Sequence, residues 1–531
     1  MAKIEVYDTT LRDGAQSEGI NFSTSDKLKI IKILDEFGID YIEAGWPGAN
    51  PIDVEVFSEI KKINLQNSKI AAFGCTKKPQ IRPQEDKVLD MLLRAETEIV
   101  TIFGKTWDFH VTCALNTSLE ENLDMITSSV EYLKSQGRRV FFDAEHFFDG
   151  IINNEEYSLA TIKAALDGGA ERIILCDTNG GTINNVIYRY TKLVLGKFEG
   201  IKLGIHAHND SDLAVANSIA AVDAGAIQIQ GTINGYGERC GNTNLCSAIP
   251  ILQLKKGHDV IGDKLEKLVY SAKAIGEIAN IAVSSNAPFV GSSAFAHKAG
   301  IHASGVSKNS KTYEHISPEL VGNSRKILIS DQAGAASVRE KLEYLKLIDK
   351  IDEKEIPAII EHIKKLEWSG YAFEGAEASF ELLVMQLLNK FPNYFEILNL
   401  RIIGDHFDAR TNIKTEASVK LKVGDKIYHT VSEGDGPVNA IDRAFRKALI
   451  SKYPEIEKFK LSDFKVRILD SKGGTAAVVR VNIETTDGFN KWDTVGVSEN
   501  VIKASFRAII DSLIYGLALN RTNKEKTAEK V

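Results

Sequence analysis

The stretch YSLATIKAALDGGAERIILCDT, residues 157–178, contains the pattern that decides the fold. Its first part, Tyr157–Asp167, has the amphipathic spacing of a helix, and Gly168 follows it, as glycine commonly follows helix C-termini. Arg172–Cys176 is then a short apolar run of strand length, and polar residues come directly after it. The stretch therefore predicts a helix, a tight turn and a buried strand that ends in polar residues.

The same unit recurs along the first 255 residues. Alternating strands and helices predict a parallel sheet built from right-handed crossovers. Eight such units in about 250 residues match a (β/α)8 TIM barrel, in the α/β class. An open doubly wound sheet is the alternative, because periodicity alone does not show that the sheet closes. The expected strands are Ile4–Tyr7, Tyr41–Glu43, Ile70–Phe73, Ile99–Phe103, Arg139–Asp143, Arg172–Cys176, Lys202–Ala207 and Ala226–Gln230, and expected helices include Asp26–Phe37, Leu119–Gln136, Tyr157–Asp167 and Asp210–Ala224.

Length, composition and charge fit a large globular enzyme. The chain has 531 residues, 44% of them hydrophobic, and a formal net charge of −7. This mildly acidic balance disfavours nucleic acid as a partner, and no apolar run reaches the roughly 18 residues that a membrane span needs. The N-terminus lacks the apolar core of a signal peptide, and the five cysteines form no C-x-x-C pair. We therefore expect a cytoplasmic protein with no disulfide framework, no nucleic-acid partner and no membrane partner.

The chain changes character after the eighth unit, and its C-terminal part contains an internal repeat. Tyr428–Val431 and Trp492–Val495 are similar strand runs, and the helix-like segments that follow them contain the similar triplets 444–446 (AFR) and 505–507 (SFR). Two strand–helix units of this kind predict a pseudo-symmetric α+β domain that is separate from the barrel. The expected domains are a catalytic barrel at 1–260, helical connector subdomains that complete the active site at 261–394, a regulatory and dimerisation domain at 395–518, and a flexible tail at 519–531.

Polar residues follow most of the predicted barrel strands. Catalytic residues of TIM barrels lie at the C-terminal ends of the strands, so these side chains should converge at one mouth. They are Asp8, Arg12, Asp13, Glu43, Asp143, Glu145, Asp177, Thr178, His206, His208, Asn234 and Glu238.

His206 and His208 form an H-x-H motif at the end of the seventh predicted strand. Strand side chains alternate between faces, so both imidazoles point the same way and can share one ion. The alternative is a pair of polar histidines with no ligand. Asp13, after the first strand, favours the metal hypothesis because it completes a His₂-carboxylate set. Such a set suits Mg²⁺, Mn²⁺, Co²⁺ or Zn²⁺ and does not choose among them.

Three other mouth residues have a functional and a structural interpretation. Arg12 would stabilise an oxyanion, unless it only forms ion pairs within its loop. Thr178 would donate to a substrate carboxylate, unless it caps a helix. Glu145 would transfer protons, its pKa raised by apolar neighbours such as Phe147 and Phe148, unless it is a surface acid and the two phenylalanines only pack.

Several long motifs resemble the 2-isopropylmalate/homocitrate/citramalate synthase family. The resemblance covers nearly the whole chain, and the loops after the fourth and fifth strands are most similar to the citramalate branch. The motifs are Asp8–Gly14 with Gln16, Glu43-Ala44-Gly45, Phe103–Thr112, Asp143–Gly150, His206-Ala207-His208, Asn234–Asn242 and Glu433–Ala440.

The resemblance implies an acyltransferase that joins acetyl-CoA and pyruvate in a metal-dependent Claisen condensation and gives citramalate for isoleucine biosynthesis. Asp13, His206 and His208 match the family's metal ligands, and Asn242 matches a further position near the ion. The C-terminal domain resembles the family's amino-acid-sensing domain, so the resemblance also implies a homodimer with isoleucine as a possible effector.

The remaining catalytic positions also follow from the resemblance. Arg12 matches an arginine beside the keto oxygen, Thr178 a contact to the 2-oxo-acid carboxylate, and Glu145 the family's mouth glutamate. His302 corresponds to the histidine implicated in enolising acetyl-CoA, and Tyr313 is a neighbouring catalytic candidate. Many relatives have H-x-D at the histidine, whereas this chain has serine in place of the aspartate at position 304.

Two alternative functions remain from the sequence. The first is a 2-isopropylmalate or homocitrate synthase that uses another 2-oxo acid, against which we expect the bulky Phe147 and Phe148 to restrict the substrate pocket. The second belongs to another class, a non-catalytic metal-loaded amino-acid sensor. For the C-terminal domain, plain dimerisation without sensing is the alternative.

Overall fold

The structure is a computed structural model, and it describes residues 3–297, 305–306, 309–327, 342, 354–373, 376–405, 414–469 and 477–528. Contacts between residues divide the chain into two compact units. The first comprises Met1–Phe295 with His315–Arg325, and the second comprises Ala296–Glu314 with Lys326–Val531.

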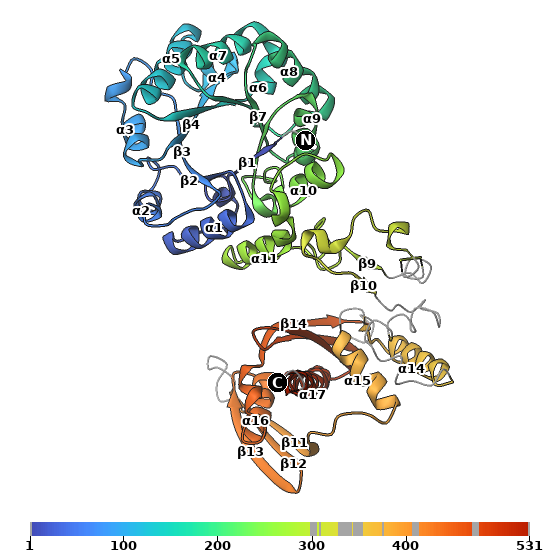
Figure 1. Ribbon diagram of the computed structural model, residues 1–531. Coiled ribbons are helices and arrows are strands. Elements are labelled where there is room, and N and C mark those ends of the chain that lie inside the picture. Colours follow the sequence, from blue (N-terminus) through green and yellow to red (C-terminus); the bar gives the residue numbers. More distant parts are fainter. Residues whose placement is uncertain are drawn as a thin grey trace. The chain divides into compact units, whose positions relative to one another are not determined.

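Within residues 3–297, eight parallel strands form a closed barrel in sequence order (Figure 1). Pairing of Glu5–Asp8 with Gln228–Gly231 closes the sheet, which confirms the TIM barrel and excludes the open sheet. Most strands continue one or two residues beyond the predicted runs, because the polar residues at the mouth still pair. The strands are β1 (Glu5–Asp8), β2 (Tyr41–Gly45), β3 (Lys69–Cys75), β4 (Ile99–Lys105), β5 (Arg139–Glu145), β6 (Arg172–Asp177), β7 (Leu203–Ala207) and β8 (Gln228–Gly231).

Helices surround the barrel and follow the expected alternation. α1 begins with a capping box between Ser23 and Asp26 and ends at Gly38 in the left-handed conformation. The helix expected from Asp210 begins only at Ala214, because Asp212 has a positive φ of 57°. The helices are α1 (Thr24–Phe37), α2 (Pro51–Ile60), α3 (Lys87–Arg94), α4 (Asp108–Cys113), α5 (Leu119–Ser135), α6 (Phe147–Asn153), α7 (Glu155–Gly168), α8 (Asn184–Lys197), α9 (Ala214–Ala224), α10 (Leu245–Pro250) and α11 (Leu268–Ile278).

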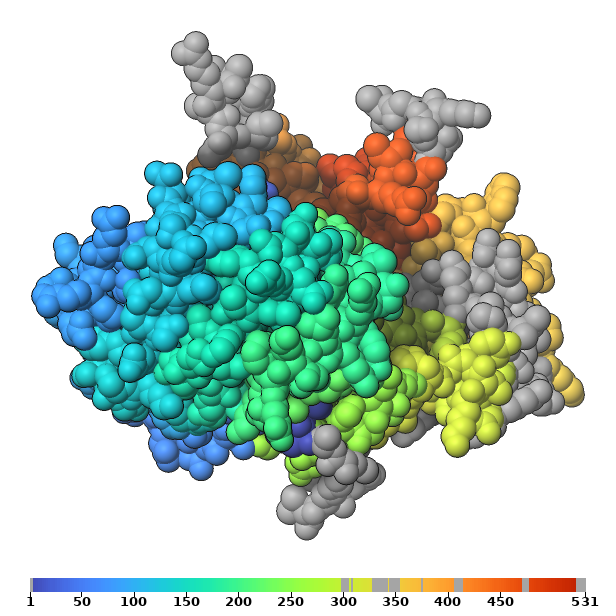
Figure 2. All heavy atoms as spheres, turned by 90° about the horizontal axis from the view of Figure 1, so that it is seen from above, coloured from blue at the N-terminus to red at the C-terminus, as the bar shows by residue number. Residues whose placement is uncertain are grey.

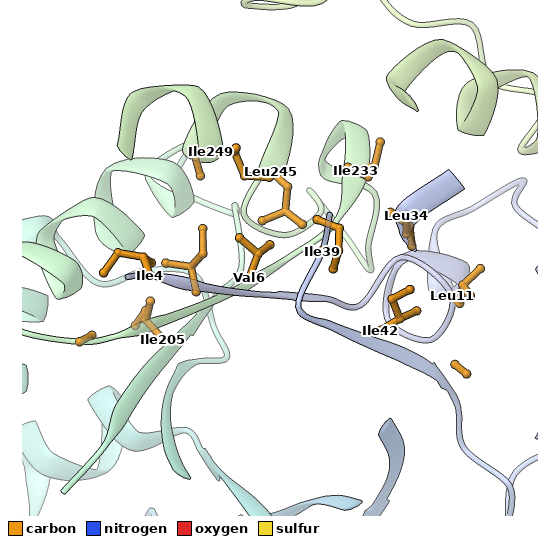
Figure 3. Packing of buried hydrophobic residues seen from close by; sticks show 14 of the residues in the cluster. Ile4, Val6, Leu11, Leu34, Ile39, Ile42, Ile205, Ile233, Leu245 and Ile249 are labelled. Atoms are coloured by element: carbon orange, nitrogen blue, oxygen red, sulfur yellow. The ribbon is translucent and has the colours of Figure 1, made fainter. Parts of the chain in front are cut away.

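The main core of this unit lies between the strands and the surrounding helices. Figure 3 shows Val6 of β1 and Ile205 of β7 in one cluster of buried residues with Leu245 and Ile249 of α10. A smaller cluster of buried residues consists of side chains from the barrel strands, among them Tyr7 and Phe141. In the space-filling view the barrel residues, coloured blue to green, pack closely against one another (Figure 2).

The C-terminal part of the second unit contains two three-stranded antiparallel sheets, each followed by a helix, which confirms the internal repeat. The first strand of each sheet has a bulge, at Ile397/Asn399 in one and at Leu461/Asp463 in the other. The two bulges are separated by 461 − 397 = 64 positions in the sequence. The elements are β11 (Glu396–Asp405), β12 (Lys414–Val423), β13 (Lys426–Gly434) and α16 (Pro437–Leu449), then β14 (Lys460–Ile468), β15 (Val479–Thr486), β16 (Lys491–Ser498) and α17 (Val501–Ala528), preceded by α14 (Ile356–Trp368) and α15 (Glu377–Leu387).

One hydrogen bond is repeated in both halves and fixes their correspondence. Thr430 Oγ1 donates to Ala444 O over 2.8 Å, and Thr494 Oγ1 donates to Ala508 O over 2.8 Å. The offset is again 508 − 444 = 64, whereas pairing of the triplets that begin at 444 and 505 implied 505 − 444 = 61. The triplet pairing was therefore wrong by three residues, nearly one helical turn.

No helix within the described ranges is both long enough and apolar enough to cross a bilayer.

Candidate active site

Asp13, His206 and His208 converge at the mouth of the barrel. One donor atom from each lies within 4.8 Å of the other two, and all three residues are buried. His206 Nε2 lies 3.3 Å from His208 Nε2 and 3.3 Å from Asp13 Oδ2. Two ring nitrogens and a carboxylate oxygen that face one another without intervening protein atoms form a donor set for one divalent cation.

The electrostatics of Asp13 and His208 favour the forms that bind metal, whereas the pKa of His206 is raised, because burial, which lowers it, is outweighed by the hydrogen bond and the charge of Asp13. Burial alone would raise the pKa of Asp13, but Arg12 and the hydrogen bond from His206 outweigh it and hold this pKa well below its usual range. Burial, followed by the charge of His206, lowers the pKa of His208 to about 3. An ionised carboxylate and a neutral imidazole are the forms that a cation requires.

Asn242 lies next to this set. Its Nδ2 donates to Asp13 Oδ2 over 2.9 Å and lies 3.4 Å from His206 Nε2, whereas its buried Oδ1 has no hydrogen-bond partner. Turning the carboxamide by 180° exchanges the two atoms and presents the oxygen to Asp13 and His206, an arrangement that only a cation between them stabilises. A Cβ at Gly237 would lie 2.0 Å from Asn242 Oδ1, so this close approach requires glycine. The residues present therefore fit a divalent ion.

Arg12 is held beside the metal-site residues by a second buried group. Its Nε lies 2.5 Å from Glu43 Oε1, and its terminal nitrogen NH1 lies 3.5 Å from Asp13 Oδ2. Tyr7 donates its hydroxyl to Glu43 Oε2 over 2.7 Å. The loop-internal ion pair with Asp13 is thus the longer of the two, and the glutamate of β2 is the principal partner of Arg12.

An aromatic cluster lies against the guanidinium and was not expected from the sequence. Arg12 lies over the Phe73 ring at 3.7 Å, Phe73 stacks on Phe103 at 5.6 Å between centroids, and Trp46 packs edge-on against both rings. Phe73 and Phe103 occupy alternate, inward-facing positions near the ends of β3 and β4. That position was the available indication; Phe73 was expected only as a strand residue, and Phe103 as a strand residue that opens the Phe103–Thr112 motif.

The surroundings of Glu145 differ from the expectation. Its carboxylate forms an ion pair with Lys105, whose strand β4 pairs with β5. Phe147 and Phe148 are fully buried in the main hydrophobic core, so they pack there and do not form apolar surroundings for the carboxyl. The packing interpretation of these phenylalanines is therefore confirmed, and the expectation that they restrict the substrate pocket is wrong.

Thr178 is positioned by the neighbouring strand. Its Oγ1 accepts a hydrogen bond from the backbone N–H of His146 over 2.9 Å. It does not cap α8, whose N-cap is Ile183. Because a hydroxyl both accepts and donates, Thr178 retains an O–H that can donate to a substrate oxygen.

Several other mouth residues support the structure of loops. Asp8 accepts hydrogen bonds from the backbone and side chain of Thr10, and burial raises its pKa to about 7. Asp177 accepts a hydrogen bond from Thr182 over 2.7 Å, and burial raises its pKa to about 6. Asn234 donates to the backbone oxygen of residue 272. The polar residues at the mouth thus include both candidate ligands of a metal and residues that stabilise loops.

Two further candidates come from beyond the barrel in the sequence. His302 and residue 304, where serine replaces the family aspartate, fall outside the described residues. Tyr313 follows the short helix η6 (Ser310–Thr312) in the second unit and is 44% exposed.

Comparison with known proteins adds three family models and a set of close relatives. The HMGL-like model matches residues 3–274, the homocitrate synthase post-HMGL domain-like model matches 289–370, and the LeuA allosteric (dimerisation) domain model matches 374–517. The (R)-citramalate synthase of Aquifex aeolicus is 53% identical over 97% of this chain and 98% of its own length, and that of Geobacter sulfurreducens is 49% identical over 97% and 98%. A 2-isopropylmalate synthase of Methanocaldococcus jannaschii is 33% identical over 96% and 94%.

These matches extend over the barrel, the connector and the repeated domain. Sequence identity to these two (R)-citramalate synthases is higher than identity to the 2-isopropylmalate synthase. The chain belongs to the HMGL-like family and, within it, to the group of (R)-citramalate synthases.

Proposed function

We propose that the protein is an enzyme that condenses acetyl-CoA with pyruvate and hydrolyses the thioester, giving (R)-citramalate and CoA for isoleucine biosynthesis. The observation that carries the proposal is the placement of Arg12 beside the Asp13, His206 and His208 donor set, in a chain about half identical to (R)-citramalate synthases over nearly its whole length. Identity to a 2-isopropylmalate synthase is only 33%, which favours pyruvate over a branched 2-oxo acid.

Asp13, His206 and His208 would hold the divalent metal, with the Asn242 carboxamide as a further ligand. When bound, a Mg²⁺, Mn²⁺, Co²⁺ or Zn²⁺ ion supplies Lewis-acid polarisation of the 2-oxo acid. Thr178 would orient the substrate by donating its hydroxyl to the pyruvate carboxylate. Its oxygen is held in place by the hydrogen bond that it accepts from the backbone N–H of His146.

The bond changes assign roles to the remaining residues. A base, for which His302 is the candidate and Tyr313 its neighbour, removes a proton from the acetyl methyl group. The resulting carbanion attacks the keto carbon of pyruvate, a C–C bond forms, and the keto oxygen takes the electron pair as an alkoxide. Arg12 would stabilise this alkoxide, and Glu145, paired with Lys105, is the nearby carboxylate for proton transfer. Water then cleaves the thioester and releases CoA as the thiol.

We further propose that Phe73, Phe103 and Trp46 determine the size of the accepted 2-oxo acid. The three rings contact one another, and Phe73 contacts the Arg12 guanidinium that would bind the keto oxygen. A substrate side chain on that side of the keto group therefore meets aromatic carbon at short range. One methylene is worth only about 1–3 kcal/mol in such surroundings, so selection against larger substrates should be partial.

For the whole chain we propose a catalytic barrel at 1–260, connector subdomains at 261–394, a regulatory and dimerisation domain at 395–518 and a tail at 519–531. The match to the LeuA allosteric (dimerisation) domain supports a homodimer and an allosteric effector. Isoleucine, the end product of the proposed route, is the proposed effector.

The test is a thiol-release assay with acetyl-CoA and pyruvate, 2-oxobutanoate, 2-oxoisovalerate or 2-oxoglutarate, followed by chiral chromatography of the product. We expect the highest kcat/KM with pyruvate and a single enantiomer of citramalate. Phe73→Leu should increase the ratio of kcat/KM for 2-oxobutanoate to that for pyruvate, with Phe148→Leu as a control in the core. Comparable kcat/KM for 2-oxoisovalerate would refute the citramalate assignment, and no thiol release with any 2-oxo acid would favour the sensor.

A further inference from the structure

Gln230 lies behind the proposed metal site and connects two of its buried groups. It is fully buried on β8, where its register partner on β7 is His206. Its Oε1 lies 3.0 Å from His206 Nδ1, and its Nε2 donates to Asp143 Oδ1 over 3.3 Å. A chain of polar contacts thus runs from the carboxylate of β5 through the amide of β8 to the imidazole of β7.

With Asp143 ionised, the order of donors and acceptors along this chain has one consistent solution. The Asp143 carboxylate accepts, so the Gln230 amide must present its NH₂ group to it, which leaves Oε1 facing His206. The opposite amide orientation would place Oε1 against the carboxylate oxygen and the NH₂ group against the ring. With Oε1 as acceptor, His206 donates from Nδ1, so Nε2, the atom that faces Asp13 and His208, is the ring nitrogen left for a cation.

We propose that Gln230, oriented by Asp143, is a positioning residue that holds His206 in the tautomer and ring orientation in which Nε2 binds the metal. The proposal rests on the proposed metal site and deepens it. Histidines that bind metals commonly donate their second N–H to an outer partner, whose loss typically weakens metal affinity 10- to 100-fold.

His208 differs from its neighbour in this respect. Its Nδ1 is buried and has no hydrogen-bond partner among the described residues. The ring of His208 therefore has no comparable partner for Nδ1, and His206 is the ligand whose tautomer the protein determines. Loss of Gln230 should accordingly affect affinity through a single ligand, without removing the donor set.

The chain offers a matched control on the same strand. Gln228 precedes Gln230 by two residues, is equally buried on the same face, and donates to Glu5 Oε2 over 3.3 Å. Glu5 also accepts from Arg172, toward the N-terminal ends of the strands. Gln230→Met and Gln228→Met thus remove the same amide from two levels of the barrel interior, and only the first lies behind the metal site.

The experiment uses the full-length protein, stripped with a chelator and titrated with Mn²⁺ while electron paramagnetic resonance measures unbound Mn²⁺. We expect Gln230→Met to raise the Kd for Mn²⁺ by about 10- to 100-fold and Gln228→Met to change it less than twofold. Thermal unfolding of both metal-free variants shows whether they fold. If Gln230→Met binds Mn²⁺ within twofold of the wild type, or if Gln228→Met weakens binding equally, the proposal is wrong.

A reciprocal double variant removes the concern that Gln230→Met only disturbs packing. Gln230→Glu with Asp143→Asn keeps an oxygen facing His206 Nδ1, reverses the amide–carboxylate pair and conserves the total charge. It should restore Mn²⁺ affinity to within about fivefold of the wild type, and affinity as weak as that of Gln230→Met would overturn the proposal. Failure of the proposed function has a different outcome, since a wild type that binds Mn²⁺ but releases no CoA with pyruvate leaves these affinities interpretable. A wild type that binds no Mn²⁺ refutes the metal site and this proposal together.

Discussion

Glu43→Gln should show whether activity depends on the position of Arg12, because the variant keeps the arginine and changes only its principal partner. The substitution is nearly isosteric and keeps an oxygen to accept the Tyr7 hydroxyl, but it removes the charge 2.5 Å from Arg12 Nε. Burial lowers the pKa of Arg12, but the charges of Glu43 and Asp13 outweigh it in the wild type. Without Glu43 the guanidinium still stays charged, because an arginine is effectively always protonated. In the variant a charged guanidinium therefore retains only the longer contact to Asp13.

The structure sets the magnitude of the effect. Removing one partner of a fully buried ion pair costs about 3–5 kcal/mol. Asp13 at 3.5 Å compensates part of this, and the Arg12 side chain is 13% exposed, so we expect about 2–3 kcal/mol of destabilisation of the barrel. A shift of the guanidinium toward Asp13 by about 1 Å should lower kcat/KM roughly 100-fold, equivalent to about 2.7 kcal/mol of transition-state stabilisation.

The measurement combines steady-state thiol release with urea unfolding, and Glu5→Gln is its matched control. Glu5 forms the corresponding ion pair with Arg172 at 2.8 Å, at the other end of the barrel interior. Glu5→Gln should destabilise the barrel by a similar amount while kcat/KM stays within threefold of the wild type. If Glu43→Gln keeps kcat/KM within threefold, or if both variants lose activity equally, Glu43 does not position Arg12.

Three further predictions concern metal, pH and regulation. Asp13→Ala should abolish Mn²⁺ binding and thiol release, and full activity in a metal-free, chelator-treated sample would contradict this. Burial raises the pKa of Asp8 to about 7 from an ordinary value of about 3.9, so the stability from its proton is complete below pH 4 and is lost as pH rises through 7. Asp8→Asn should therefore remove part of the decline in urea stability between about pH 4 and 7, and an unchanged pH profile would count against this. Isoleucine should weaken acetyl-CoA binding, and a tenfold effect corresponds to a coupling free energy of about 1.4 kcal/mol. By linkage, acetyl-CoA must weaken isoleucine binding by the same factor. If calorimetry detects no isoleucine binding, only the dimerisation role of the C-terminal domain remains.

The barrel could be predicted because each of its strand–helix units has a recognisable pattern within a short stretch of sequence. Runs such as Arg172–Cys176 are apolar over strand length, and the helices between them are amphipathic and end at glycine. The H-x-H motif was equally local, since alternation along a single strand places His206 and His208 on one face. The boundaries were less accurate at the mouth, where polar residues such as Lys105 and Glu145 still belong to paired strands.

The partners of the site residues could not be predicted, because they come from distant parts of the chain. Arg12 and Glu43 are 31 positions apart and His206 and Gln230 are 24 apart, and only the closed sheet brings them together. Glu145 shows the same limitation. Its sequence neighbours are phenylalanines, but successive residues after a strand diverge, and the side chain that reaches its carboxylate comes from the adjacent strand.

The barrel interior contains the same polar residue types at both ends, which is why residue type alone could not locate the chemistry. Toward the N-terminal ends of the strands, Glu5 accepts from both Arg172 and Gln228, so the charges there are paired, although Gln228 Oε1 has no hydrogen-bond partner. At the mouth, Glu43 binds Arg12, but two ring nitrogens face each other across 3.3 Å and an amide oxygen of Asn242 has no partner. Buried polar groups that are mutually satisfied stabilise a fold, whereas buried donors left facing one another cost free energy unless a ligand joins them. Single unsatisfied atoms occur at both ends, so the convergence of donor atoms from Asp13, His206 and His208 is what distinguishes the functional end of this barrel from the structural one.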